Sequence, residues 1–429
     1  MRPRFQVKLH NRLLQLTRKE SKDLDNFWLG FCLYTISYIF IQTGHLNFKV
    51  LQGLQSIGLI LIFVQYSKVA RLKPINGYLK NIFSIYVIWQ CLIVFRGMSF
   101  SYGFIKQIFF DASNGMMNYF APLLLLLPRN LEAYKKVFRI IIIFAIFYLI
   151  YDISFIRELL SGDRNNIKNT AIVEYGFLLS ITVCFLLLTS PYHNFKKNIF
   201  ALAVILISLF FGIFRARRGM ILICLSQLFF CYYFYLNNAR NKVLILTASG
   251  LIIFAAISYT KTAFLQNREN IFSFLLERGT KDTRTGVEEY FYNDLNTVDW
   301  IIGKGINGQY FCPDIDEDSI SGYRRIIETG YLQIILNGGI ISLVLILLIT
   351  IPAIFKGLFY SRNILSKAAG AWVFLWVIYL YPATMQGFTL YYAVFWMAIG
   401  ICYSSSIRNI PENKIKLFFL TKEPDLEIV

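Results

Sequence analysis

Long apolar segments alternate with short polar ones along most of the chain. Runs of this kind can cross a bilayer as helices, which takes about 20 residues each. The pattern therefore predicts an all-α polytopic membrane protein with about 12 transmembrane helices. The twelve apolar runs lie near residues 27–42, 50–66, 81–95, 112–128, 137–156, 171–190, 199–214, 219–236, 243–260, 331–353, 368–386 and 388–405.

One polar interruption, Lys261–Gly330, is far longer than the others. Connections of more than about 12–15 residues are uncommon unless they have a function. We therefore expect the function to depend on this loop. The chain divides into an N-terminal segment (1–26), helices one to nine (27–260), the large loop (261–330), helices ten to twelve (331–405) and a tail (406–429).

Composition agrees with a membrane protein. The 429 residues are 56% hydrophobic and only 16% charged, whereas soluble proteins carry about 25% charged residues. The net charge of +18 would suggest a nucleic-acid partner in a soluble protein. No basic aromatic module is present, so basic loops that set membrane orientation are the better explanation, and no nucleic-acid partner is expected.

The distribution of Lys and Arg predicts the orientation. With the N-terminus inside, the inner segments hold 26 basic residues, the short outer loops hold 9 and the large loop holds 8. Short loops decide the positive-inside rule. Both termini are therefore expected in the cytoplasm, with the large loop outside.

No metal or cofactor is expected. The seven cysteines form no CxxC pattern, and only Cys312 lies in the large loop. The histidines His10, His45 and His193 are scattered, and none lies in that loop. These spacings match no metal-ligand motif.

Three arginines, Arg215, Arg217 and Arg218, gather at an outer turn between two spans, just before Gly219. One interpretation is that they reach outer-leaflet headgroups. The other is that they grip a phosphate or diphosphate, since the guanidinium group stays charged and binds phosphate through two parallel hydrogen bonds.

The large loop carries further candidate groups. Its arginines include Arg268, Arg278, Arg284, Arg324 and Arg325, and its twelve acidic residues outnumber its eight basic ones. Mixed acids and bases suit a site that handles a charged leaving group and activates a hydroxyl. Glu328, where the loop re-enters the membrane, is either a general base or half of an Arg–Glu pair that orders the loop.

Other polar motifs favour structural roles. Gly303–Gly308 does not match a P-loop, and a turn that docks the loop on the membrane face is the preferred interpretation. The acidic run Asp314–Asp318 fails the EF-hand pattern and is expected to be a solvated turn. Asp111, Asp152 and Glu174 lie near outer span ends, either as functional carboxylates or simply at the interface.

Together these features resemble the O-antigen polymerase (Wzy-type) branch of the O-antigen ligase/polymerase superfamily. The resemblance rests on Arg218-Gly219 between two mid-chain spans, the outer loop Lys261–Gly330, a W-x-x-G-x-G-x-x-G segment from Trp300 to Gly308, and an E-x-G-Y-L entry into the next helix from Glu328 to Gly339.

The resemblance implies a GT-C-like, metal-independent glycosyltransferase of the bacterial cytoplasmic (inner) membrane. It would move a growing glycan, such as O antigen of lipopolysaccharide or capsule, from undecaprenyl diphosphate onto an incoming lipid-linked repeat unit. A chain-length regulator and a flippase are the implied partners.

The resemblance also implies roles for individual residues. It carries Arg218 and Arg284 over as arginines that face the diphosphate. Charge placement adds Arg215, Arg217, Arg278, Arg324 and Arg325 as substrate-binding residues. Related ligases keep His-Asn where this chain has Glu328-Thr329, which favours a polymerase and makes Glu328 the first choice for the base.

Two alternatives stay open. A glycan ligase would cap an acceptor with finished polymer instead of lengthening it. A flippase or exporter for the lipid-linked sugar would place its charges within the spans, whereas here they gather on one face.

Overall fold

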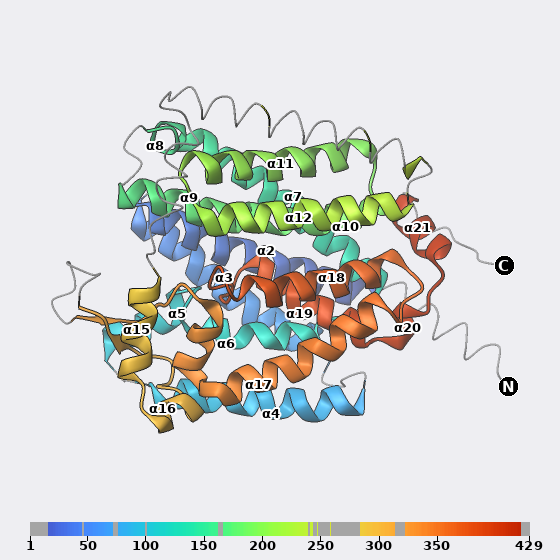
Figure 1. The fold of residues 1–429 in the computed structure, drawn as a ribbon. Coiled ribbons are helices and arrows are strands. Elements are labelled where there is room, and N and C mark those ends of the chain that lie inside the picture. The colour runs from blue at the N-terminus through green and yellow to red at the C-terminus, as the bar shows by residue number, and fades with distance from the viewer. Residues whose placement is uncertain are drawn as a thin grey trace.

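A computed structural model describes residues 16–44, 47–71, 76–98, 101–161, 166–238, 241–242, 247, 258, 284–313 and 322–421. The described part is almost entirely helical (Figure 1). Its α-helices and strands are α2 (Arg18–Thr43), α3 (Phe48–Val69), α4 (Gly77–Arg96), α5 (Tyr102–Phe110), α6 (Met116–Phe120), α7 (Leu131–Ser154), α8 (Ile156–Leu159), α9 (Ile167–Ser180), α10 (Cys184–Leu188), α11 (Phe195–Phe214), α12 (Arg218–Asn238), α15 (Thr285–Asp294), α16 (Thr297–Ile302), β1 (Tyr310–Phe311), β2 (Tyr323–Arg324), α17 (Gly330–Leu358), α18 (Ile364–Tyr379), α19 (Leu390–Tyr403), α20 (Ser405–Arg408) and α21 (Glu412–Leu420). Short 3₁₀ turns occupy Ala121–Leu126, Ile181–Val183 and Ser190–Tyr192.

Eight helical segments of the described chain are long and apolar enough to cross a membrane. Three shorter apolar segments, Met116–Leu126, Ile364–Tyr379 and Leu390–Tyr403, coincide with three further predicted runs. The run 243–260 falls almost wholly outside the described residues. The prediction of an all-α polytopic membrane protein is therefore confirmed, while the count of twelve spans stays a prediction.

The helices form one bundle with two distinct ends. Figure 1 shows α5, α8, α15 and α16 at one end and α20 and α21 at the other. The α21 end is fastened by polar contacts: Lys136 pairs with Asp25 at 2.6 Å, and Tyr192 donates to Glu412 at 3.0 Å. We call the end with α15 and α16 the loop end.

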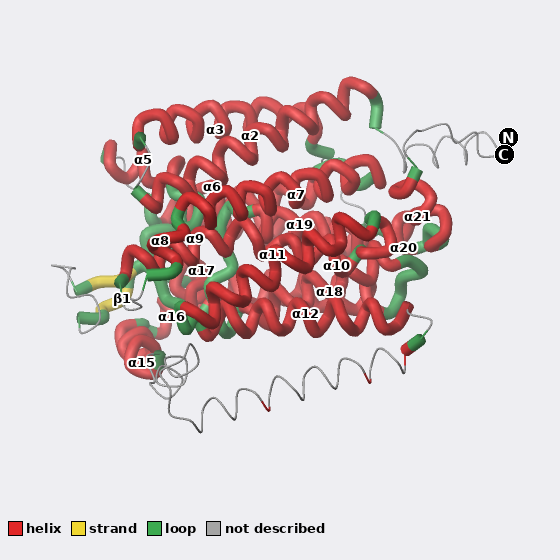
Figure 2. Tube along the Cα trace, turned by 90° about the horizontal axis from the view of Figure 1, so that it is seen from above, coloured by secondary structure: helices red, strands yellow, loops and turns green. Residues whose placement is uncertain are grey.

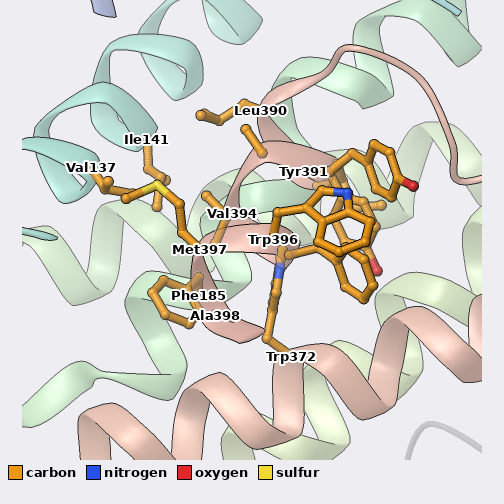
Figure 3. Packing of buried hydrophobic residues seen from close by; sticks show 14 of the residues in the cluster. Val137, Ile141, Phe185, Trp372, Leu390, Tyr391, Val394, Trp396, Met397 and Ala398 are labelled. Atoms are coloured by element: carbon orange, nitrogen blue, oxygen red, sulfur yellow. The ribbon is translucent and has the colours of Figure 1, made fainter. Parts of the chain in front are cut away.

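The centre of the bundle is α19, which Figure 2 shows surrounded by other helices. Every residue of α19 is buried, as expected for a helix that is apolar on all sides. Aromatic rings fill the space around it (Figure 3): Tyr391 lies 4.9 Å from Trp372, which in turn lies 5.5 Å from Phe185, between ring centroids. Such ring pairs add to the stabilisation from burial.

The described part of the large loop folds on itself and onto α17. Strands β1 and β2 pair antiparallel, with Tyr310 opposite Arg324. The α15 side chains Val287 and Phe291 are buried with Tyr310 and with Leu332 of α17. The loop is thus a packed cap on the bundle.

A break in α17 fixes the position of this cap. Gly339 has φ +69°, outside the helical region, so the carbonyls just before it lose their helical donors. The loop supplies replacements: Lys304 N–H donates to Leu336 O at 2.7 Å, and Gly305 N–H to Asn337 O at 2.9 Å. The Trp89 indole N–H donates to Gly338 O at 3.0 Å.

Candidate functional site

The turn between α11 and α12 sets the directions of its three arginines. The helix ends with Ala216 at φ +51°, and Arg217 N–H bonds back to Gly212 O at 2.8 Å. This is the Schellman ending, which usually places glycine at the left-handed position. The reversal after Ala216 lets α12 begin at once, at Arg218.

The three arginines of this turn lie in different surroundings. Arg215 is fully buried, and its Nη1 donates to Ser161 O at 3.2 Å. Arg217 Nη1 lies 3.4 Å from the Glu174 carboxylate on α9. Arg218 is exposed. The sequence groups them as one cluster, but only Arg217 and Arg218 are placed where a ligand at the surface can reach them.

The connection between α18 and α19 brings this turn next to the large loop. A Cβ on Gly219 would lie 3.1 Å from Pro382 O. The same carbonyl accepts a hydrogen bond from Arg284 Nη2 at 2.7 Å, while Tyr381 O accepts one from Nη1 at 3.4 Å. Arg218-Gly219 and Arg284, distant in sequence, therefore meet at Pro382.

Glu328 lies in the same region, next to Arg284. Its carboxylate lies 3.5 Å from Arg284 Nε and its side chain is 67% exposed. The hydroxyl of Thr384 donates to the backbone carbonyl of Glu328 at 3.2 Å and holds the segment that carries it. The ion pair joins Glu328 to Arg284, whereas Arg325, its near neighbour in sequence, contacts Gln107 at 2.8 Å.

We call Arg217, Arg218, Arg284, Glu174 and Glu328 the arginine–glutamate cluster. Glu174 and Glu328 are close enough to influence each other electrostatically. Three helices, α12, α15 and α17, begin at or beside these residues. The first turn of a helix presents free N–H groups and a partial positive charge. The cluster therefore combines anion-binding groups with two exposed carboxylates.

The other predicted binding arginines lie elsewhere. Arg324 is in β2, opposite Tyr310. Arg325 lines a small hollow of about 20 Å³ with side chains of α5 and α17. Arg278, like Arg268, lies outside the described residues, as does the acidic run 314–318.

The glycine-rich segment Gly303–Gly308 forms a turn that docks the large loop on the bundle. Lys304 forms ion pairs with Asp294 and Asp299, and its backbone docks into the break of α17. Asp111 caps the turn after α5 by accepting from Ser113 N–H at 2.9 Å and Tyr38 OH at 3.2 Å. Asp152 is buried in α7. Of the three carboxylates that the sequence places near outer span ends, only Glu174 joins the cluster.

Sequence reasoning missed the segment Leu380–Thr384, whose carbonyl and hydroxyl groups join the parts of the cluster. Its signal was Pro382, a residue that ends or kinks helices and that lies near the end of the apolar run 368–386. Glu288 was also missed: it accepts a hydrogen bond from the Thr329 hydroxyl at 2.6 Å. Within the described residues, no group of three or more His, Cys, Asp or Glu side chains could hold a metal ion.

Comparison with protein-family models, with curated proteins and with solved structures found no match to this chain.

Proposed function

We propose that the protein is a polymerase of lipid-linked oligosaccharide repeat units, working at the outer face of the bacterial cytoplasmic membrane. The observation that carries the proposal is that the Arg284–Glu328 and Arg217–Glu174 ion pairs lie together at the loop end, with Arg218 next to Gly219, which approaches Pro382. The arginines and Glu328 come from two separate elements of the sequence resemblance, the Arg-Gly turn and the entry to α17, and from the loop between them.

The proposed reaction is a glycosyl transfer. The bond between the donor's anomeric carbon and the carrier diphosphate breaks, and polyprenyl diphosphate leaves with the bonding electrons. A hydroxyl of the acceptor sugar forms the new glycosidic bond and gives its proton to the Glu328 carboxylate. The arginines stabilise the negative charge that develops on the departing diphosphate.

The ion pairs of the cluster suit an exchange of partners. The Arg284–Glu328 and Arg217–Glu174 pairs are 3.5 and 3.4 Å long, and in each the carboxylate is more than half exposed. Such pairs contribute about 1 kcal/mol or less, whereas bidentate contacts of arginine with phosphate are stronger. A diphosphate can therefore replace the Glu328 carboxylate beside Arg284 and leave that carboxylate free to take a proton.

Arg218→Ala and Arg284→Ala test the proposal in a deletion strain complemented with the full-length protein. We expect both variants to insert in the membrane but to make no long-chain glycan, because the leaving group loses its stabilisation. Arg218→Lys and Arg284→Lys should also fail if bidentate contact is needed. The matched control is Arg157→Ala, an exposed arginine of α8 at the same end, which should leave the glycan ladder unchanged.

Three results would contradict the polymerase. Normal long-chain glycan in both alanine variants would remove the arginine argument. Full-length polymer that fails only to reach its final acceptor would indicate a ligase. Single repeat units held in the cytoplasmic leaflet of the deletion strain would indicate an exporter.

A further inference from the structure

A groove lies between α3 and α5 at the loop end, and none of the residues that line it belongs to the arginine–glutamate cluster. It has a volume of about 420 Å³ and is open to the outside. Lys49, Gln52 and Ser56 line it from α3, and Tyr102 and Lys106 line it from α5. On each helix the lining residues follow the i, i+3, i+4, i+7 spacing of a single face. The groove is therefore built from two complete helix faces.

The groove is positively charged. Among the described residues, neither Lys49 nor Lys106 forms an ion pair, and no acidic side chain lines the groove. Lys106 Nζ lies 5.1 Å from the centre of the Phe48 ring, which holds it at the rim. Two of the nine basic residues that the sequence assigns to short outer loops thus converge here, where the positive-inside rule disfavours them. The groove suits an anion.

The surroundings of the groove point to a lipid. Leu54, Ile57 and Ile60 continue along the exposed side of α3 with 36%, 51% and 62% of their surfaces exposed. On a helix that crosses the membrane, such side chains face the acyl region. A ligand with its anionic head between the lysines can lay an apolar tail along α3.

The other face of α5 lines a second, much smaller hollow of about 20 Å³. Gln107 lines it together with the polar residues Asn307, Arg325, Gln333 and Asn337, and with apolar side chains. Amide groups offer both donors and acceptors, as sugar hydroxyls require. Gln333 lies on the first turns of α17, five residues after Glu328. Helix α5 thus separates the α3–α5 groove from a small amide-lined hollow that borders the first turns of α17.

We propose that the α3–α5 groove binds the diphosphate of the acceptor, a polyprenyl-diphosphate-linked repeat unit. This inference rests on the proposed function, because that reaction uses two substrates that each carry a lipid-linked diphosphate, and the arginines of the cluster bind only the diphosphate of the donor. The acceptor's lipid head lies between Lys49 and Lys106, which leaves its sugars at the surface of the loop end, where Glu328 also lies.

Binding to the purified full-length protein in nanodiscs tests the groove, with undecaprenyl diphosphate as probe. We expect two binding events, one of which weakens about tenfold for each lysine removed in Lys49→Gln and Lys106→Gln. Gly53→Leu should block the same event sterically, since nothing lies within 4 Å of a Cβ at Gly53 and the helix can accept the side chain. The control is Lys356→Gln, which removes a lysine held 5.4 Å from the Tyr403 ring.

Unchanged binding in the two lysine variants and in Gly53→Leu would overturn the proposal. Equal displacement of the probe by phosphatidylglycerol would also overturn it, by showing a general lipid-phosphate site. In turnover with a lipid-linked repeat unit, the lysine variants should raise KM for the acceptor about tenfold and leave kcat near its original value. A fall in kcat without a change in KM would assign the lysines to another step.

The two proposals fail separately. If Arg218→Ala and Arg284→Ala keep activity while the lysine variants lose one binding event, the groove stands as a lipid-diphosphate site and the proposed chemistry fails. If the arginine variants lose activity while the lysine variants bind and turn over normally, only the groove proposal fails.

Discussion

At the scale of single residues, Arg284 has the most connected position in the candidate site. Its guanidinium contacts two backbone carbonyls, those of Tyr381 and Pro382, and the Glu328 carboxylate. The carbonyls fix the orientation of the planar group, while the exposed carboxylate can leave. The same side chain therefore has two kinds of contact: the backbone carbonyls position it, and the Glu328 carboxylate can be exchanged for another anion.

Glu328→Gln distinguishes a base from an ordering ion pair. An exposed pair contributes about 1 kcal/mol or less, so thermal unfolding in detergent should change little. A general base contributes about 100-fold or more to the rate, so polymer formation should fall by at least about that factor. A variant with full activity, or one that unfolds and loses activity together, would return Glu328 to the ordering role.

His193 gives a pH dependence at the opposite end of the bundle. Burial, with a contribution from Lys197, lowers the pKa of His193 from 6.5 to about 3. The ring lies against Phe138, and its Nε2 is 3.1 Å from the Thr189 hydroxyl. The folded state keeps this histidine neutral, so between pH 6.5 and 3 the unfolded state binds more protons and stability falls as the pH falls.

At pH 5.5 the expected loss is about 1.4 kcal/mol relative to neutral pH. Thermal unfolding at pH 7.5 and 5.5 measures it, and His193→Gln serves as the control because glutamine does not titrate. The same loss of stability in wild type and His193→Gln would show that other groups are responsible.

At the scale of elements, the break in α17 and the glycine turn of the loop form one joint. Gly339 supplies the left-handed residue and Gly303, also at positive φ, approaches Asn337 closely. The two glycine-containing motifs recognised in the sequence are thus the two halves of one contact. The glycines of both motifs therefore have a structural role at this contact.

Gly339→Ala tests the joint. The new Cβ would lie 2.0 Å from Ile301 O at a φ of +69°, so steric overlap adds to backbone strain. We expect a loss of about 3 kcal/mol or more in the free energy of unfolding. The matched control is Gly44→Ala, at φ +70° with nothing within 4 Å, which should cost only the strain, about 1–2 kcal/mol. Equal losses in the two variants would mean that docking of the loop is not rigid.

The helices also show which features of the fold and of the site can be predicted from the sequence. The apolar runs predicted the spans because the bilayer fixes their length and polarity. The apolar pattern leaves the short helix α5 between the predicted runs 81–95 and 112–128, because nine residues are too few to give the signal of a membrane span. The arginine turn was found, but the different directions of Arg215 and Arg217 follow from the left-handed Ala216, which composition does not reveal. The Arg284–Glu328 pair depends on tertiary folding and has no local pattern.

At the scale of the whole molecule, the two ends carry different chemistry. The α21 end holds structural ion pairs, such as Lys136 with Asp25. The loop end holds the arginine–glutamate cluster, the small amide-lined hollow and the α3–α5 groove with its two lysines. A protein that only needed to anchor itself would not require three polar sites at one end. The arrangement suits a membrane enzyme whose substrates all arrive on one face.

The proposed function requires the loop end to face the outside of the cytoplasmic membrane. Tyr102 of α5 and Val298 of α16 are 83% and 60% exposed at this end, and Lys414 of α21 is exposed at the other. In a background without the native cysteines, Tyr102→Cys and Val298→Cys should react with an impermeant maleimide in intact spheroplasts. Lys414→Cys should react only after permeabilisation, because the positive-inside rule predicts that the basic segments at that end lie in the cytoplasm. The reverse pattern would place the arginine–glutamate cluster in the cytosol, on the wrong side for an incoming repeat unit, and the polymerase would be excluded.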